Sequence, residues 1–510
     1  MHDIYINNTL TGTKDLFVPI QDGKVGMYCC GPTTYNYIHI GNGRPLVVFD
    51  TIRRYLKYKG YEVSYISNFT DVDDKIIDKA ATEGEEPQAL ANRYIEEYYK
   101  DADALNVQRA DVHPQVSKHM PEIIAFVDAL VQKGMAYPLD GDVYYSVNKF
   151  PEYGKLSKRS REDLMDGARV DVDQRKQDAA DFALWKKAKP GEPYWDSPWG
   201  PGRPGWHIEC SAMSHQYLGE SFDIHGGGAD LIFPHHENEI AQSEGRFGKQ
   251  MARFWIHNGF ITVNQEKMSK SLGNFFLLRE IFASYPGQTV RFYLLSVHYR
   301  SPLDFDDGKL DMAQRGLDRL KNAARTAAAI AGGKIPGGGS VNGGTSSNGE
   351  NADDPATISF LTETEQIKTQ FEEAMNDDFN TALAIAALFE LARSINSYAN
   401  EEKPSAQALR SALDVLVVLS GVLGLDLLDS NSIEEEDSNT KEALTSLLEE
   451  LGQDGGGEET TEELMDVLLI LRQTFRKDKD YAGADRIRDG LKALGIVVED
   501  TAQGPRWYKA

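Results

Sequence analysis

Val25-Gly26-Met27-Tyr28-Cys29-Cys30, followed by Gly31-Pro32-Thr33-Thr34, is the stretch that decides the fold of this 510-residue chain. Its apolar run predicts a buried strand, and the Gly-Pro pair predicts a turn directly after that strand. A helical stretch from about Asn42 to Lys59 and a second strand, Tyr61–Ile66, come next along the chain. Because strand, glycine turn, helix and strand make up the βαβ unit of a nucleotide-binding parallel sheet, the N-terminal part is expected to be an α/β domain.

Two polar stretches of biased composition interrupt the rest of the chain. Gly332–Ala356 has the Gly/Ser-rich composition of a flexible linker, and Asn431–Thr461 is acidic and Gly-rich around one short possible helix. Between them, residues 357–430 show helical apolar spacing throughout, which predicts a helical bundle. After them the sequence predicts two helices and one strand, at Glu462–Lys477, Tyr481–Leu494 and Ile496–Asp500.

The composition is that expected of a folded cytoplasmic protein. Hydrophobic residues make up 41% of the chain and charged residues 26%, which is normal for a globular protein. No targeting segment is visible, and the most membrane-like stretch, between Asp414 and Asp426, is far shorter than the ~20 residues of a spanning helix. Three cysteines, Cys29, Cys30 and Cys210, are too few for a disulfide framework. We therefore expect a cytoplasmic protein without a membrane partner, whose cysteines are buried, reactive or bound to a metal.

The net charge of −25 is spread unevenly. Asp426–Asp466 holds fifteen acidic residues and one lysine, whereas Val467–Ala510 holds nine Lys/Arg and six Asp/Glu. Six of the basic residues in this tail are Arg472, Arg476, Lys477, Lys479, Arg486 and Arg488. An acidic protein can still bind RNA through such a local basic surface. For any one of these side chains, however, a solvated helix face is the simpler explanation.

The first motif with a chemical interpretation is His39-Ile40-Gly41-Asn42. It follows the first strand and opens a helix, which is where α/β folds bind phosphate groups. Gly41 would let a nucleotide approach the backbone closely, while His39 and Asn42 could donate hydrogen bonds to its phosphates. The alternative is that the histidine only caps the helix or lies at the surface.

The second motif is Lys267-Met268-Ser269-Lys270-Ser271. Two lysines three residues apart, Lys267 and Lys270, suit a loop that neutralises a polyphosphate, because compact ammonium groups can follow charge as it moves between oxygens. A solvated lysine-rich turn is the alternative, and it fits less well because apolar segments flank the motif.

A third group of residues has the chemistry of a metal site. In the stretch Pro234–Ile240, which predicts a helix, His235 and Glu239 are i, i+4 and share one face, whereas His236 pairs with Ile240 and is expected to face elsewhere. Adjacent cysteines on a strand point to opposite faces, so only one of Cys29 and Cys30 can be a ligand. Two thiolates, an imidazole and a carboxylate are acceptable zinc ligands. A purely structural zinc site, or no metal at all, remains open at this point.

Together, the His-Ile-Gly-Asn and Lys-Met-Ser-Lys-Ser elements resemble the paired signatures of class I aminoacyl-tRNA synthetases, with Asn42 in place of the commoner second histidine. Longer strings resemble cysteinyl-tRNA synthetases in particular, and the likeness covers nearly the whole chain outside the two biased stretches. These strings are Asn68–Lys75, Gly205–Met213, His225–Ile240, Lys267–Phe276 and, in the tail, Ala484-Asp485, Gly495-Ile496, Glu499-Asp500 and Gly504–Trp507.

The resemblance implies a reaction and a set of site residues. It implies that ATP, accompanied by Mg²⁺, activates L-cysteine as an adenylate, and that the cysteinyl group then passes to tRNA(Cys). The implied ligands of one Zn²⁺, which would bind the substrate thiolate, are Cys30, Cys210, His235 and Glu239. The expected charge-stabilising residues are His39, Asn42, Lys267 and Lys270, and those expected to hold ATP are His39, Gly41, Gly227, Asp230 and Lys270. Trp206 is a candidate wall of the thiol pocket, Trp507 a candidate platform for an RNA base, and the family as a whole suggests a monomer.

The expected fold is thus a Rossmann-type parallel sheet with an insertion domain, followed by a helical bundle and a small C-terminal anticodon-binding domain. The predicted division in residue numbers is 1–125 and 221–265 for the two halves of the catalytic domain, 126–220 for the insertion, 266–331 for the lysine loop and stem-contact region, 332–356 for the linker, 357–430 for the bundle, 431–461 for the acidic segment and 462–510 for the anticodon domain.

Two rival functions remain open in the sequence. One is a zinc-dependent ligase that joins cysteine to a small amino-sugar, as mycothiol-type ligases do. The other is a catalytically inactive RNA-binding relative. The tail from Tyr481 to Trp507 favours a tRNA substrate over the first, and the presence of both phosphate motifs and the whole set of candidate ligands argues against the second.

Overall fold

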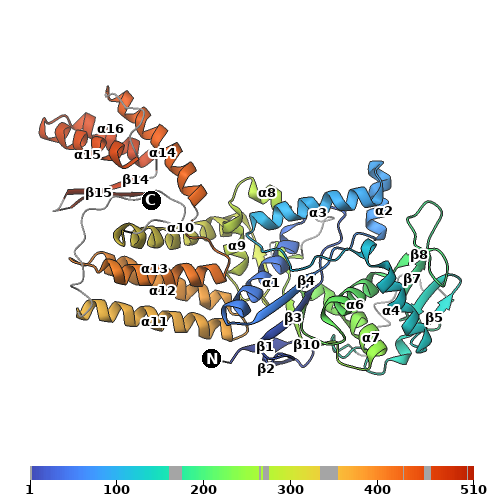
Figure 1. Ribbon diagram of the computed structural model, residues 1–510. Helices are drawn as coiled ribbons and strands as arrows, with labels where there is room; N and C mark the ends of the chain where they lie inside the picture. Colours follow the sequence, from blue (N-terminus) through green and yellow to red (C-terminus); the bar gives the residue numbers. More distant parts are fainter. Residues whose placement is uncertain are drawn as a thin grey trace. The chain divides into compact units, whose positions relative to one another are not determined.

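The computed structural model describes residues 3–509 except 160–174, 264–265, 268–274, 333–353, 429, 453–460, 495 and 502–503. The described residues form two compact units, one reaching from the N-terminal strands through residue 427 and the other made mainly of residues 428–509. Figure 1 shows the elements of both. Among the described helices, none has the length and apolar character needed to cross a bilayer.

The centre of the first unit is a four-stranded parallel sheet in the order β10-β9-β3-β4. Its strands are β3 (Lys24–Cys29), β4 (Glu62–Ser67), β9 (Phe222–Gly228) and β10 (Ala252–Asn258). Most side chains of these strands are buried, as expected for a parallel sheet with helices on its faces. The α/β fold that the Val25–Ile66 pattern predicted is therefore confirmed.

Helix α1 (Ile40–Tyr58) joins β3 to β4. It begins two residues earlier than the sequence predicted, because His39 is its N-cap and forms a capping box with Asn42. Its buried face includes Val47, Phe49 and Leu56, which are less than 1% exposed. The other helices of this part are α2 (Asp74–Glu83), α3 (Pro87–Ala104), α4 (Met120–Gln132), α6 (Trp206–Leu218), α7 (Glu237–Phe247), α8 (Leu278–Phe282) and α9 (Gly287–Leu295).

Between β4 and β9 the chain forms a separate antiparallel sheet, in the order β5-β6-β7-β8. Its strands are β5 (Ala136–Leu139), β6 (Asp142–Tyr145), β7 (Phe182–Lys187) and β8 (Gly202–Pro204). Two smaller sheets complete the unit: the hairpin β1 (Tyr5–Asn8) with β2 (Thr13–Leu16), and β11 (Ile261–Val263) between β12 (Glu266–Lys267) and β13 (Leu303–Phe305). The insertion predicted between the two halves of the parallel sheet therefore has a fold of its own.

Four helices form a bundle in the same unit: α10 (Asp307–Ile330), α11 (Pro355–Asn376), α12 (Thr381–Ala399) and α13 (Ala406–Val422). The helical interpretation of 357–430 agrees with α11 to α13. Helix α10 packs against α12 and α13, however, so the bundle also includes residues that the sequence placed in the preceding 266–331 region. The Gly-rich composition of residues 332–356 suggested a domain boundary between α10 and α11. The helices on either side of that stretch nevertheless belong to one bundle.

The second unit contains α14 (Ser430–Glu450), α15 (Thr461–Lys477), α16 (Tyr481–Ala493) and the antiparallel pair β14 (Ile496–Thr501) and β15 (Gly504–Lys509). The expectation of only a short helix in 431–461 is wrong, because α14 is 21 residues long. Its C-terminal half has apolar residues at helical spacing, and Leu444 and Leu448 are buried in a core with α15 and α16. The apolar positions were overlooked in the sequence because the segment as a whole is strongly acidic.

Candidate functional site

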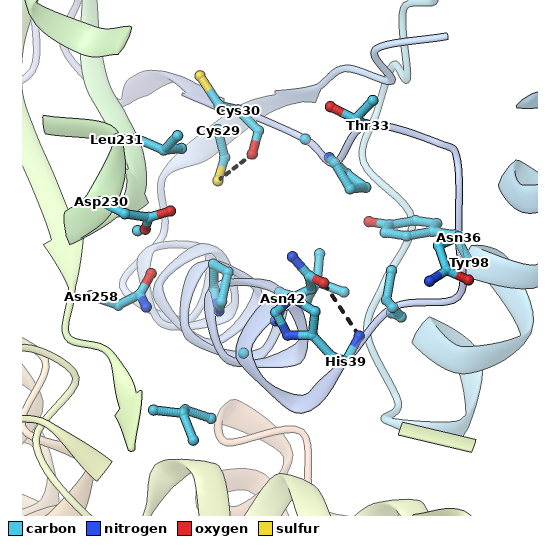
Figure 2. A pocket seen from close by; sticks show the side chains of 18 of the residues that line it. Cys29, Cys30, Thr33, Asn36, His39, Asn42, Tyr98, Asp230, Leu231 and Asn258 are labelled. Atoms are coloured by element: carbon cyan, nitrogen blue, oxygen red, sulfur yellow. Dashed lines mark hydrogen bonds between the residues drawn. The ribbon is translucent and has the colours of Figure 1, made fainter. Parts of the chain in front are cut away.

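A cavity of about 430 Å³ opens at the carboxyl ends of β3 and β9. In the strand order β10-β9-β3-β4, the two neighbours of β3 are β4 on one side and β9 on the other, so the strand order diverges at β3. Open α/β sheets bind ligands at such a point of divergence. Figure 2 shows side chains converging there from the end of β3, the start of α1 and the turn after β9.

The turn after β3 that opens the cavity requires glycine. A Cβ atom at Gly31 would lie 1.6 Å from the carbonyl oxygen of Asn68, and Gly31 N donates a hydrogen bond to Asn68 Oδ1 over 3.0 Å. This close approach ties the end of β3 to the segment after β4. Cys30 is thereby held at the cavity wall.

The four side chains predicted as metal ligands come together at this end of the cavity. Cys30 Sγ lies 3.5 Å from Cys210 Sγ and 3.5 Å from His235 Nε2. Glu239 Oε1 lies 3.3 Å from Cys30 Sγ and 3.1 Å from His235 Nε2. One donor atom from each of the four residues is within 4.8 Å of all the others. Cys30 lines the cavity, while the other three are buried behind it.

The spacing and chemistry of these donors suit a tetrahedral zinc ion. Bonds of about 2.3 Å to sulfur and about 2.0–2.2 Å to nitrogen or oxygen give a tetrahedron whose edges are roughly 3.3–3.8 Å long. The donor separations of 3.1 to 3.5 Å are close to these edges. Two thiols, an imidazole and a carboxylate buried together are also a costly cluster unless a cation compensates them.

Electrostatic interactions within the cluster shift the pKa of each group. Burial alone would raise the pKa of Cys210, but hydrogen bonds from Cys30 and His235 lower it to about 6. Burial, reinforced by the neighbouring Cys210, raises the pKa of Cys30 well above its usual value. Burial opposes the charge of His235 and Glu239 too, yet their interaction raises the pKa of His235 to about 10 and, with His225, lowers that of Glu239 to about 2. Without a metal, the cluster therefore holds protons on Cys30 and His235 at neutral pH.

Further histidines surround the cluster, and the sequence interpretation missed their contribution. His225 Nε2 lies 2.9 Å from Glu239 Oε2, and His207 Nδ1 lies 2.9 Å from His235 Nδ1, so each fixes the orientation of one candidate ligand. His236 was expected to face elsewhere, and that expectation is wrong. It is fully buried, and its Nε2 has no hydrogen-bond partner and lies 3.9 Å from Glu239 Oε1.

Because of this packing, a second donor set, consisting of Cys30, His225, His236 and Glu239, meets the same distance criterion. The error has a local cause. Phe233 has φ −139° and ψ 132°, so the backbone before α7 is not regular helix, and the i, i+4 rule does not assign faces to residues there.

Two neighbours shape the thiol end of the cavity. The Trp206 indole lies against His235, with ring centroids 4.5 Å apart, and lines the cavity as the sequence suggested. Cys29 does not join the donor cluster. Its Sγ is 3.8 Å from the carbonyl oxygen of Cys30, and burial raises its pKa to about 12. Figure 2 shows the sulfur atoms of Cys29 and Cys30 directed apart.

The opposite end of the cavity is the start of α1. His39 Nδ1 accepts a hydrogen bond from Asn42 N over 3.2 Å. His39 N donates one to Asn42 Oδ1 over 3.3 Å, and Figure 2 draws this second bond as a dashed line. The His39 ring also makes an edge contact with Phe275, with centroids 4.8 Å apart. His39, Gly41 and Asn42 all line the cavity. Asn42 is therefore a capping residue whatever its further role.

Of the two residues after Gly226 that were expected to bind the nucleotide, Gly227 and Asp230, only Asp230 lies at the cavity. Gly228 and Asp230 line the cavity, whereas Gly227 is inside β9 and is not part of the wall. A Cβ atom at Gly227 would lie 2.9 Å from the His236 ring, so that glycine is needed for packing. Figure 2 shows Asn258, at the end of β10, beside Asp230 at the cavity edge, a position that no sequence motif indicated.

The lysine loop is only partly within the described residues. Lys267 is the second residue of β12 and pairs in register with Thr262 of β11, and Lys270 lies outside the described residues. The described residues on either side, Ile261 and Phe275, line the cavity.

Comparisons with known proteins agree with this arrangement. Residues 16–315 match the family "tRNA synthetases class I (C) catalytic domain", residues 370–428 the "DALR domain", and residues 461–507 the "Cysteinyl-tRNA ligase anticodon binding domain". A cysteine–tRNA ligase of Heliobacterium modesticaldum is 57% identical over 99% of both chains. One of Halalkalibacterium halodurans is 50% identical, again over 99% of both.

Solved structures share the fold at low identity. The methionyl-tRNA synthetase of Mycobacterium tuberculosis bound by methionyl-adenylate has a TM-score of 0.53 at 15% identity, covering 78% of this chain and 90% of that one. The leucyl enzyme in a ternary complex from Agrobacterium radiobacter has a TM-score of 0.58 at 11% identity, covering 81% of this chain and 85% of that one. The chain matches the catalytic and anticodon-binding family models and is more than half identical to full-length relatives. It therefore belongs to the cysteine–tRNA ligase family of class I aminoacyl-tRNA synthetases.

Proposed function

We propose that this enzyme activates L-cysteine with ATP and transfers the cysteinyl group to tRNA(Cys), with Zn²⁺ held by Cys30, Cys210, His235 and Glu239 selecting the amino acid. The observation that carries the proposal is the convergence of these four donors beside a cavity whose other end is a helix N-terminus. Of the two possible donor sets, this one leaves His225 free to orient Glu239 through the 2.9 Å contact.

Selection of cysteine needs more than a shaped pocket. Serine, alanine and valine are close in size, and an apolar pocket separates near-isosteres by only ~1–3 kcal/mol. A bound zinc ion would offer a soft partner that prefers a thiolate to a hydroxyl. Cys30 is the ligand that lines the cavity, so the metal would be reached from the side on which the substrate enters. Trp206 would enclose the thiol by excluding water from that side.

Activation requires stabilisation of the charge on the reacting phosphate. The cysteine carboxylate attacks the α-phosphorus of ATP, which is accompanied by Mg²⁺, and pyrophosphate leaves. His39, at the start of α1, would donate a hydrogen bond there together with the backbone amides of the first helical turn. Lys267 and Lys270 would supply positive charge, Gly41 would give the backbone room for the nucleotide, and Asp230 would accept hydrogen bonds from the ribose hydroxyls. Gly227, which the sequence had also suggested for this role, is not part of the cavity wall.

Transfer then needs only a terminal tRNA hydroxyl, which attacks the carbonyl of the adenylate and releases AMP. The basic tail, including the exposed Lys477, Lys479 and Arg486, supports contact with the RNA. We further propose a cytoplasmic location and a monomeric state. The three unpaired cysteines are consistent with the former, and the family pattern supports the latter.

Neither rival function is favoured. Both the anticodon-domain match and the full-length relatives favour tRNA as the substrate over a small amino-sugar. An inactive RNA-binding protein would have no need for a buried set of metal donors beside a cavity.

The deciding experiment is cysteine-dependent exchange of pyrophosphate into ATP, with and without a zinc chelator, followed by charging of tRNA(Cys). We expect exchange that the chelator abolishes and zinc restores, and charging with cysteine only. Absence of exchange would show that the protein does not activate cysteine with ATP. Exchange without charging would instead support the amino-sugar ligase.

A further inference from the structure

A buried tyrosine lies next to the donor cluster, and the steps described above make no use of it. Tyr28 of β3 is fully buried, and its hydroxyl has no hydrogen-bond partner among the described residues. Buried donors without a partner are costly and rare in folded proteins, so this hydroxyl calls for an explanation. Tyr28 does not line the active-site cavity, and it therefore does not touch the substrate.

The position of Tyr28 in the sheet directs its side chain toward the candidate metal ligands. Side chains alternate between the two faces of a strand, so Tyr28 shares the face of Cys30, and Cys29 lies on the other. The Tyr28 ring lies against the ring of His225, with centroids 5.4 Å apart. His225 is the residue that orients Glu239, so the phenol packs against a direct support of the cluster.

The groups of the cluster also act on the hydroxyl. Burial raises the pKa of Tyr28 well above its usual value, and Cys210, Cys30 and Glu239 raise it further. The effect of Cys210 is the largest of the three and includes a direct interaction of its sulfur with the hydroxyl, which falls short of the geometry of a formed hydrogen bond. A phenol holds its proton at neutral pH in any case, so toward a thiolate it can only donate.

We infer that the Tyr28 hydroxyl donates a hydrogen bond to Cys210 Sγ once that sulfur is a zinc-bound thiolate. The inference rests on the proposed zinc site. Two thiolates and one carboxylate outweigh the charge of the zinc ion, and the thiolate of the substrate would add a further negative charge. A hydrogen bond to Cys210 would take up part of this excess in a buried site. Tyr28 is thus a positioning residue, which favours binding of the substrate sulfur by acting through Cys210.

The variant Tyr28→Phe tests this role, because it removes the hydroxyl and keeps the ring. Tyr55→Phe is the matched control, since Tyr55 is also fully buried but its hydroxyl donates to Asn376 Oδ1 of α11 over 2.7 Å. Both variants and the wild type are loaded with Co²⁺ in place of Zn²⁺, and the thiolate-to-cobalt charge-transfer absorption is recorded before and after addition of L-cysteine. The dissociation constants of zinc and of L-cysteine, thermal unfolding and pyrophosphate exchange are measured in parallel.

For Tyr28→Phe we expect the charge-transfer absorption to shift and the dissociation constants of zinc and of L-cysteine each to rise by about tenfold, because residues that support metal ligands contribute ~10–100-fold. The turnover of exchange at saturating cysteine should fall by less than about threefold, since the hydroxyl does not touch the reacting atoms. Tyr55→Phe should have the absorption and both dissociation constants of the wild type.

Unchanged absorption and unchanged affinities in Tyr28→Phe, with equal or greater thermal stability, would show that the hydroxyl only fills space and would overturn the inference. A wild type that binds neither zinc nor cobalt would reject the proposed metal site, and the inference with it. Should Tyr28→Phe fail to fold, the infrared C–O stretching band of tyrosine in the wild type, recorded with and without zinc, takes its place. A shift on addition of zinc supports the hydrogen bond, and the absence of a shift contradicts it.

Discussion

The two ends of the active-site cavity are built in different ways. The metal end collects side chains from the residue after β3, from α6, and from α7 and the residues just before it, which are far apart in sequence and mostly buried. The nucleotide end is one helix start and one turn, at which His39 and Asn42 cap each other and backbone groups face the cavity. The difference suggests that amino-acid choice depends on a pre-assembled cluster, whereas phosphate binding depends on local backbone geometry.

The largest expected effect is that of removing one donor at the metal end. Cys210→Ser should lose bound zinc and reduce cysteine-dependent exchange by more than about a hundredfold, because even residues that only orient ligands contribute ~10–100-fold. Metal analysis of the purified protein and the exchange rate check this. Retention of both zinc and activity would show that Cys210 is not a ligand. Ser214→Ala, a buried hydroxyl on the same helix, is a control for packing.

The pH dependence of metal binding is the next largest effect. At pH 7 Cys30, with its raised pKa, and His235, with a pKa of about 10, hold protons, whereas Cys210, at about 6, and Glu239, at about 2, do not. All four must be unprotonated to bind the ion, so binding should release about two protons.

Zinc affinity should therefore rise by about a hundredfold per pH unit through the neutral range. It should rise less steeply once the pH exceeds the pKa of His235, because only Cys30 then still holds a proton. Calorimetry in buffers of different ionisation enthalpy measures the proton count. An affinity independent of pH between about 6.5 and 8, a range that lies between the pKa values of Cys210 and His235, would contradict the assigned donors.

At the nucleotide end, His39→Asn separates capping from catalysis. Asparagine is a good N-cap, so stability should change by less than about 0.5 kcal/mol, while loss of the imidazole should lower the turnover of exchange by about a hundredfold with little change in the KM for cysteine. Steady-state kinetics and thermal unfolding measure the two effects. A loss of stability without a loss of turnover would make His39 a capping residue only.

The smallest expected effect concerns ATP alone. Asp230→Asn should raise the KM for ATP about tenfold, because a hydrogen bond to a charged acceptor contributes ~1.5–3 kcal/mol. The KM for cysteine and the zinc content should not change, since Asp230 belongs to neither donor set. An equal rise in both KM values would place Asp230 in a general structural role.

The two ends of the cavity differ in how well the sequence predicted them, because one is built from contiguous residues and the other from residues far apart in the chain. The nucleotide end was predictable in place, since a strand, a glycine turn and a helix start are contiguous from Val25 to Asn42. The candidate ligands Cys30, Cys210, His235 and Glu239 were all named from the sequence, but spacing alone paired only His235 with Glu239, and the complete set depended on family resemblance.

What the sequence could not give depends on contacts across the fold. The orientation of His236, set by the irregular backbone at Phe233, was missed, as were the supports from His207 and His225. The packing of α10 into the bundle was missed for the same reason, because an apolar helix face does not indicate which other helix will pack against it.

We propose that a zinc ion held by two cysteines, one histidine and one glutamate contacts the substrate sulfur. X-ray absorption at the zinc edge, recorded before and after addition of L-cysteine, tests it most directly. We expect two sulfur scatterers at about 2.3 Å from zinc without substrate and three with it, and no change on addition of L-serine. A sulfur count that stays at two when cysteine is bound would contradict it.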